Sequence, residues 1–116
     1  MTQIELQKTA EKLWLEYCLI FPALVKFDCP KCVWNNRYTK TAGANDSYKN
    51  TVDLAAKFYA KFPAEMLRVT LPHELAHQID FNLYGWKTGA KHHRDSWKFI
   101  MVKIGLPPLL YHSMVL

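Results

Sequence analysis

An H-E-x-x-H motif at positions 73–77 constrains the fold more than any other part of this sequence. Apolar residues recur at three- and four-residue spacing from Met66 through the motif to Leu83, which predicts an α-helix that ends at Gly85. Residues four apart on a helix differ by about 400° and 6 Å, so His73 and His77 emerge on one face within reach of a single zinc ion. The alternative, a surface helix with two unrelated histidines, is disfavoured because the apolar pattern continues through the motif.

The glutamate inside the motif points to catalysis. Glu74 lies beside the histidine face, where its carboxylate can take a proton from a zinc-bound water. A catalytic zinc site also needs a third protein ligand and one open position. No glutamate follows Glu74, and the extended H-E-x-x-H-x-x-G-x-x-H form fails because Asp80 and Leu83 replace its Gly and its third His. The remaining candidates are Asp80, His92, His93, Asp95 and His112.

Among these candidates, Asp80 is poorly placed. It lies about 10 Å along the helix axis from His73, too far to share an ion comfortably. We therefore expect Asp80 to be a solvated helix residue, in preference to an acceptor that orients a ligand. His92 and His93 follow a turn between Gly85 and Gly89, which can fold the chain back over the motif helix.

The rest of the chain predicts an α+β domain, a helix and a small sheet followed by two helices. The first helix begins at a capping box formed by Thr2 and Glu5 and ends at Pro22. A small three-stranded antiparallel sheet follows, with strands near Lys31–Asn35, Tyr38–Ala44 and Lys49–Leu54.

The two later helices carry proline and glycine signals. Pro63 suits a first helical position, whereas Pro72 lies inside the apolar pattern and predicts a kink or a restart. The last helix is expected to begin near His93, to bury Trp97 and to stop at Gly105. Because 116 residues leave no room for a second core, we expect one domain over residues 1–116.

Composition narrows the possible partners and the compartment. Fifteen Lys and Arg against ten Asp and Glu give a net charge of +5, which favours a polyanion such as DNA, although ordinary solubility charge explains it equally well. A basic stretch from Lys26 to Lys49 includes Trp34 and Tyr38, which could stack on bases but are more often core residues in strands. A content of 50% hydrophobic residues excludes a disordered chain. With no bilayer-crossing run and no signal-peptide pattern, we expect an intracellular protein that does not bind membranes.

The three cysteines predict no disulfide framework, because they are odd in number and the expected compartment is reducing. Cys29-Pro30-Lys31-Cys32 looks like half a zinc knuckle, but only Cys18 and scattered histidines could complete four ligands. We expect reduced, inert thiols in preference to a second zinc site or redox chemistry.

Several strings together resemble the SprT-like (Spartan) metalloprotease family over about Cys32 to Leu106. In chain order they are Thr41-Ala42-Gly43, Val52-Asp53-Leu54, the motif with its preceding Leu71-Pro72, Leu83-Tyr84-Gly85 and His93-Arg94-Asp95-Ser96-Trp97. In that family the third zinc ligand is a His followed by Gly, two variable residues and an aromatic. Trp97 matches that aromatic, which selects His93 as the ligand, while Arg94 stands where the family usually has Gly.

The resemblance implies a zincin-like fold and a zinc-dependent endopeptidase. It implies that His73, His77 and His93 hold Zn²⁺ and that Glu74 is the general base. It also implies a substrate class, proteins bound or crosslinked to DNA, with cleavage promoted by single-stranded or junction DNA, as in DNA–protein crosslink repair. We expect a monomer in the cytoplasm at the nucleoid, or in the nucleus of a eukaryote. The family often appends a zinc ribbon with two C-x-x-C pairs, and this sequence has none, so we expect no DNA targeting through such a module.

Two other functions stay open. One is a non-catalytic, zinc-stapled module that binds nucleic acid, and the other is a peptidase of free proteins. Glu74 argues against the first, because a zinc that only staples helices has no use for an adjacent carboxylate. For a peptidase, the sheet edge near Tyr38–Ala44 could hold an extended substrate by strand addition.

Overall fold

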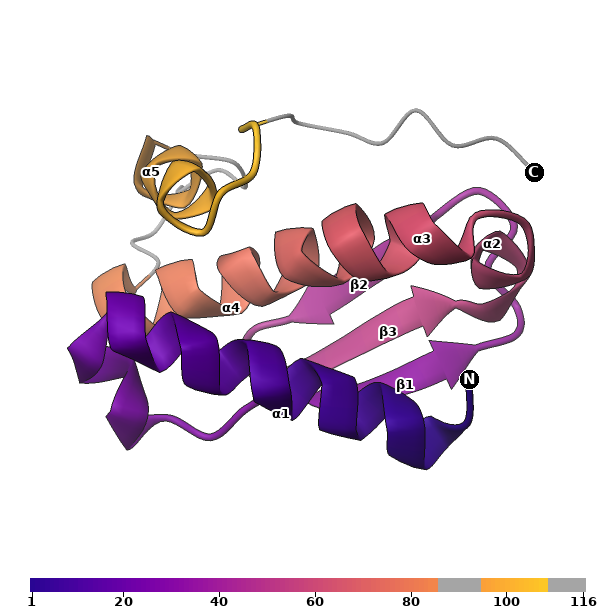
Figure 1. The fold of residues 1–116 in the computed structure, drawn as a ribbon, viewed down its shortest axis with the longest axis horizontal. Helices are drawn as coiled ribbons and strands as arrows, with labels where there is room; N and C mark the ends of the chain where they lie inside the picture. Colours follow the sequence, from indigo (N-terminus) through magenta and orange to yellow (C-terminus); the bar gives the residue numbers. More distant parts are fainter. Residues whose placement is uncertain (86–94, 109–116) are drawn as a thin grey trace.

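The computed structural model describes residues 1–85 and 95–108, and their elements follow the predicted order of helix, sheet and helices (Figure 1). The elements that frame the fold are α1 (Gln3–Ile20), β1 (Lys31–Asn35), β2 (Gly43–Asp46), β3 (Thr51–Ala55), α4 (Leu71–Tyr84) and α5 (Asp95–Lys103). Short helical segments connect them: η1 (Pro22–Lys26), α2 (Ala56–Lys61), α3 (Pro63–Glu65) and η2 (Met66–Thr70). The α+β class is confirmed, and α2 is a helix that the sequence did not predict.

Helix α1 begins and ends as its sequence predicts. The Thr2 hydroxyl accepts a hydrogen bond from the Glu5 N–H at 3.1 Å, and the Glu5 carboxylate accepts one from the Thr2 N–H at 2.9 Å. This capping box satisfies two backbone donors that a helix N-terminus leaves unpaired. The buried side of α1 carries Leu6, Ala10, Trp14 and Tyr17 at helical spacing.

The sheet is mixed, and the prediction of an antiparallel sheet is wrong for one of its two pairings. The strand order is β1-β3-β2, with β2 antiparallel to β3 but β1 parallel to it. After β1 the chain crosses to the far edge, forms β2 there, and returns between the two as β3. Strand patterns in a sequence locate strands but do not say which neighbours pair, so the direction of β1 was not determined by them.

Strand β2 also begins later than predicted. It covers Gly43–Asp46 instead of Tyr38–Ala44, because the chain turns away directly after β1, where the Arg37 N–H donates to the Asn35 side chain at 2.9 Å. The turn before β3 lies at residues 47–50, where Asn50 has a φ of 55°. Asn tolerates this left-handed backbone better than most residues do.

The two outer edges of the sheet differ. Along β1, two glutamines of α1 bind the outward-facing backbone. The Gln7 amide donates to Pro30 O at 3.1 Å and its carbonyl accepts from the Cys32 N–H at 2.8 Å. The Gln3 amide donates to Cys32 O at 2.5 Å and its carbonyl accepts from the Trp34 N–H at 3.2 Å. Along β2, no strand within residues 1–85 and 95–108 pairs with the outer side. Helix α1 therefore covers the β1 edge, whereas the β2 edge has no strand partner in the described part of the chain and is called the open edge below.

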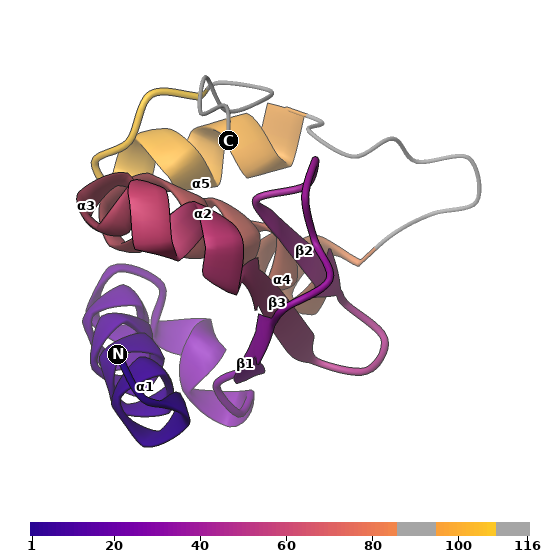
Figure 2. The same ribbon diagram turned by 90° about the vertical axis from the view of Figure 1, so that its right-hand side faces the viewer.

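Helices α1 and α4 run side by side over the sheet, with α5 on the side of α4 away from α1 (Figures 1 and 2). Helix α1 packs on β1, and α4 packs on β2 and β3. The core between these layers includes Leu6, Leu54, Leu75, Ile79 and Trp97, all fully buried. None of the helices in the described part of the chain has the length and apolar character that crossing a bilayer requires.

A π turn lets the chain pass Pro72 while staying helical. The turn covers Met66–Thr70, and the Leu71 N–H bonds to Met66 O, five residues back. Proline inside an α-helix lacks an N–H and collides with the carbonyl four residues earlier, and the wider π turn relieves both problems. The chain therefore continues into α4, where the sequence allowed a kink or a restart, and α4 ends at Gly85 with a φ of 68°, as predicted.

Candidate metal centre

His73 and His77 lie one turn apart on α4, and both are buried, with exposed fractions of 5% and 7%. Their ring centroids are 5.0 Å apart, at an interplanar angle of 66°. A zinc–nitrogen distance of about 2.0–2.1 Å, plus about 1.1 Å to the ring centre, separates two tetrahedral imidazoles by about 5 Å. The spacing and the nitrogen donors therefore fit a shared zinc ion.

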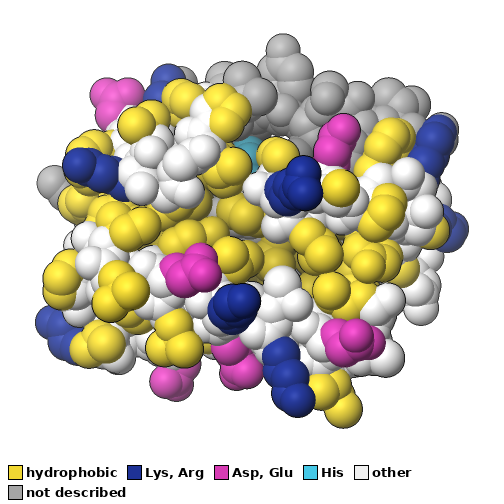
Figure 3. All heavy atoms as spheres, viewed as in Figure 1, with side chains coloured by type: hydrophobic (Ala, Val, Ile, Leu, Met, Phe, Trp, Pro, Cys, Tyr) yellow, Lys and Arg dark blue, Asp and Glu magenta, His cyan; other side chains and the backbone are white. Residues whose placement is uncertain are grey.

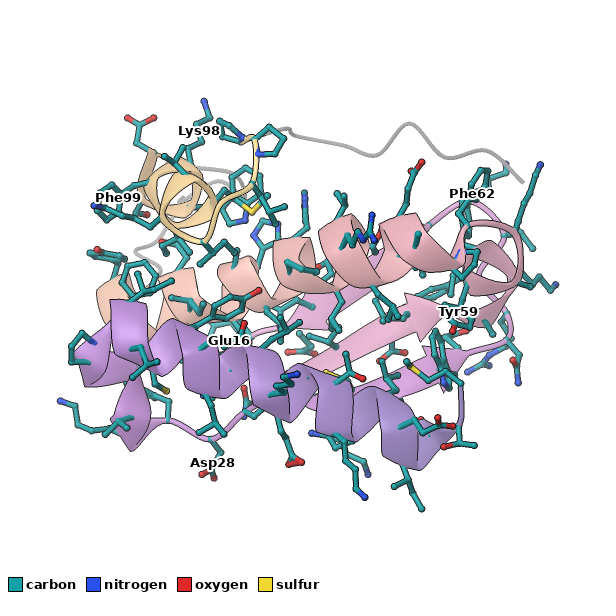
Figure 4. All side chains as sticks on the ribbon, viewed as in Figure 1. Glu16, Asp28, Tyr59, Phe62, Lys98 and Phe99 are labelled. Atoms are coloured by element: carbon teal, nitrogen blue, oxygen red, sulfur yellow. The ribbon has the colours of Figure 1, made fainter. Side chains whose placement is uncertain are left out.

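Trp97 of α5 lies against both histidines. Its ring stacks on His77 at 5.0 Å and 14°, and meets His73 edge-on at 4.9 Å and 61°. Because Trp97 is fully buried, it limits the orientations of both imidazoles and shields them from water. On the face drawn in Figure 3, histidine surface shows as a small recessed patch. The outward side of α5 carries Lys98 and Phe99, which point away from α4 (Figure 4).

Glu74 lies on the side of α4 that packs against the sheet, and only 6% of it is exposed. Burial raises the pKa of its carboxyl group to about 8, because removal from water disfavours the charged form. A carboxyl group held in this way can exchange a proton near neutral pH, which is the property that a general base or acid needs.

Gly43, the first residue of β2, makes the space for Glu74. A Cβ atom at Gly43 would lie 3.2 Å from Glu74 Cγ, 3.0 Å from Thr70 Cγ2 and 3.1 Å from Leu54 Cδ2. Such distances are tighter than ordinary van der Waals contact, so any larger residue would push against the glutamate. The close approach of the edge strand to α4 thus explains the glycine of the Thr41-Ala42-Gly43 string.

The expectation that Asp80 is a solvated helix residue is wrong. Asp80 is only 2% exposed, and its carboxylate accepts a hydrogen bond from the Ser96 hydroxyl of α5 at 2.5 Å. Helix α5 covers this position, which the pattern of α4 alone does not indicate. The bond links α4 to the helix that carries Trp97.

The choice between His93 and His92 as third ligand stays a prediction, because both lie outside the described residues. The expected start of the last helix near His93 and the candidate His112 also lie outside them. Within residues 1–85 and 95–108, no three His, Cys, Asp or Glu side chains gather closely enough to hold a metal. Of the three predicted ligands, only His73 and His77 lie in the part of the chain that the structure describes.

The thiols lie in apolar surroundings. Burial raises the pKa of Cys32 to about 12 and raises that of Cys29 as well. Both thiols donate to the same carbonyl, that of Pro30, and all three cysteines are free. This environment suits the expectation of inert, reduced thiols, because the thiolate is the reactive and metal-binding form.

Trp34 and Tyr38, the two aromatic residues considered for base stacking, are half-buried against the core. Trp34 and Tyr38 pack against the hydrophobic cluster, and the Trp34 ring meets Tyr59 at 4.8 Å. The cations Lys31, Arg37 and Lys40 are exposed around them. The stretch therefore offers exposed positive charge, while Trp34 and Tyr38 present only part of their rings for stacking.

Comparison with known proteins shows the family of the chain. The SprT-like family model matches residues 11–112, so the chain belongs to the SprT-like family. Over 73 residues the chain is 32% identical to Protein SprT of Pseudomonas syringae pv. tomato, an alignment that covers 62% of this chain and 43% of that protein. The chain thus spans less than half of this relative's length. No solved structure matches the chain.

Proposed function

We propose that this chain is a zinc-dependent endopeptidase of the SprT-like type. The observation that carries the proposal is the pair of buried imidazoles at zinc-sharing distance, with a buried carboxyl group between them in sequence on the same helix. Membership of the SprT-like family supports it. His73, His77 and His93 would hold the metal, and when bound, zinc would activate water and polarise the scissile carbonyl.

The residues of the chain then have separate tasks. Glu74 takes the proton from the attacking water and delivers it to the leaving amine. Trp97 holds the two imidazoles in place and keeps water from one side of them. Asp80, through Ser96, ties the helix that carries Trp97 to the motif helix.

The open edge of the sheet offers a place for the substrate. Strand β2 lies beside Glu74 at Gly43, whereas the β1 edge is occupied by Gln3 and Gln7. An extended peptide that adds to β2 would bring its backbone alongside the motif helix. Because main-chain hydrogen bonds supply the affinity, cleavage would depend little on substrate side chains.

The proposed substrates are proteins bound or crosslinked to DNA, cleaved by a monomer that works where DNA is present, in the nucleoid or the nucleus. The net charge of +5 and the exposed cations around β1 support attraction to a polyanion. DNA would then act by bringing enzyme and substrate together.

The deciding experiment is proteolysis of a DNA-binding protein by the zinc-loaded chain, with and without single-stranded DNA, beside a Glu74→Gln control. We expect cleavage by the wild type that DNA accelerates, and loss of cleavage in the variant at unchanged zinc content. A non-catalytic zinc module would instead bind DNA equally well in both forms and cleave in neither.

A further inference from the structure

A buried network of amide side chains connects α4 to the open strand. The Gln78 carbonyl accepts a hydrogen bond from the Asn45 side chain at 2.9 Å, and the Gln78 amide donates to Ser47 O at 3.1 Å and to Asn82 at 2.9 Å. The Asn45 amide also donates to Thr51 O at 3.0 Å, and its carbonyl accepts from the Ser47 hydroxyl at 2.6 Å. Both amides therefore use both of their N–H groups.

Burying such a network costs free energy unless every polar group finds a partner, so its place between α4 and β2 calls for a structural reason. Gln78 is only 1% exposed and Ser47 only 4%, so each unmade hydrogen bond would leave a polar group unpaired in the interior. A leucine at position 78 would suit the apolar pattern of α4 without this requirement. The glutamine instead fixes the distance and the register between α4 and β2.

Two matched contacts set that register. Glu74 and Gln78 are four residues apart on α4 and so project to the same side, about 6 Å apart along the axis. Gly43 and Asn45 are two residues apart on β2, about 7 Å along the strand. Glu74 meets Gly43, and Gln78 meets Asn45, so the helix and the strand match over this length.

The backbone of the same two strand residues faces outward. The Ala55 N–H donates to Ala42 O at 2.9 Å, and these two residues lie directly opposite each other when the β2–β3 register, in which Gly43 faces Leu54, is continued by one pair. Because hydrogen-bonded and non-hydrogen-bonded pairs alternate in an antiparallel ladder, Gly43 and Asn45 point their N–H and C=O groups away from β3. These are the groups that an added strand would bind, and they have no backbone partner among residues 1–85 and 95–108.

We propose that Gln78 is a positioning residue for the substrate: by holding Asn45, it keeps the outward-facing backbone of β2 at the distance from Glu74 that an extended peptide requires. This inference rests on the proposed endopeptidase function and deepens it. In this role Gln78 does not touch the substrate: it acts through Asn45 of β2 and through Ser47, directly after that strand.

The test measures peptide binding separately from cleavage. The probe is a fluorescein-labelled peptide of about ten residues, long enough to lie along the whole edge strand, that spans a bond the wild type cleaves in β-casein. Zinc-loaded Glu74→Gln protein binds this peptide without cutting it, and fluorescence anisotropy gives the Kd. Adding Gln78→Met should weaken binding about tenfold, as expected for loss of one or two hydrogen bonds, at unchanged zinc content.

A matched control and a modified peptide separate positioning from general stability. Asn82→Ala also removes a Gln78 hydrogen bond, but Asn82 belongs to α4 and does not hold β2, so its Kd should change by less than about twofold. Methylating the peptide nitrogens that pair with β2 should raise the Kd of the protein that keeps Gln78. The same methylation should raise the Kd of the Gln78→Met variant little further. In the active enzyme, Gln78→Met should raise KM more than it lowers kcat.

The outcomes are distinguishable. The inference is overturned if the proteins with Gln78 and with Gln78→Met have equal Kd values, or if N-methylation weakens binding by the same factor in both. In either case, cleavage by the wild type still upholds the proposed function. A wild type that cleaves nothing refutes the proposed function and this inference with it. If Gln78→Met does not fold, Asn45→Ala removes the same contact from the strand side and carries the same expectations.

Discussion

A single methyl group at Gly43 should disturb the candidate site without touching a ligand. Gly43→Ala would place a Cβ atom 3.0 Å from Thr70 Cγ2, 3.1 Å from Leu54 Cδ2 and 3.2 Å from Glu74 Cγ. Thr70 and Leu54 are fully buried, and the branched side chain of Thr70 is stiff about χ1, whereas the longer, unbranched Glu74 side chain has more torsions that can adjust. We therefore expect most of the adjustment to fall on the glutamate.

The expected loss of stability in Gly43→Ala follows from overpacking, which lowers the free energy of unfolding by about 1–3 kcal/mol in a well-packed core. For a chain of this size, each kcal/mol lost lowers Tm by about 3–6 °C. Misplacing a reacting group by about 1 Å can cost about 100-fold, so a displacement of a few tenths of an ångström should lower kcat/KM by about tenfold. Thermal unfolding and peptide cleavage, both at measured zinc content, give the two values.

Gly105→Ala is the matched control. Gly105 has a φ of 89°, and no atom of residues 1–85 or 95–108 lies within 4 Å of an added Cβ, so alanine there strains the backbone by about 1–2 kcal/mol without touching the described part of the site. We expect a comparable fall in Tm and unchanged kcat/KM. If both variants lose the same activity, or if Gly43→Ala keeps wild-type stability and activity, the close approach of β2 to Glu74 does not matter for function.

Three further predictions concern the metal and the motif. Metal analysis of the purified protein should give about one zinc per chain, falling to near zero in His73→Ala, as expected when one of three ligands is lost; a value near two would instead implicate Cys29 and Cys32. His93→Ala should weaken zinc affinity by at least about 10–100-fold, the loss typical of weaker, indirect contacts, and His92→Ala should not; the opposite ranking in a chelator competition would show that the family alignment fails at Arg94. In the metal-free protein, Glu74 has a folded pKa of about 8 above its ordinary value of 4.5, so stability should fall as pH rises between these values, by at most about 1.4 kcal/mol per unit. Urea unfolding of Glu74→Gln should lack that slope, and an identical pH dependence in both proteins would show that Glu74 titrates normally.

Local signals made much of the fold predictable. The capping box at Thr2 and Glu5, the proline after α1 and the glycine after α4 each act within a few residues, so they could be read directly. The same holds for the pair of imidazoles, because helix geometry alone brings residues four apart to one face. Strand β1 was likewise placed correctly at Lys31–Asn35.

Features that depend on distant contacts were not predictable in this way. Asp80 is buried because α5 folds onto it, and β1 is parallel to β3 because β2 takes the far edge. Helix α2 has a single buried residue, Phe58, and no side-chain cap, so it leaves little trace in the sequence. The role of Gly43 likewise became visible only when the helix and the strand were seen together.

Glutamine side chains on two helices act differently on the two edges of the sheet. On α1, Gln3 and Gln7 are four residues apart and bind the outward backbone of β1 directly, which removes that edge from strand addition. On α4, Gln78 binds the side chain of Asn45 instead, and thereby fixes β2 while its backbone groups still face outward. Among the described residues, only the β2 edge beside Glu74 is left without a bound side chain or strand along its backbone. If the proposed function holds, a peptide added to β2 would meet the motif helix in a register set by the donors and acceptors of the strand, so that cleavage could fall at a defined place with little dependence on substrate side chains.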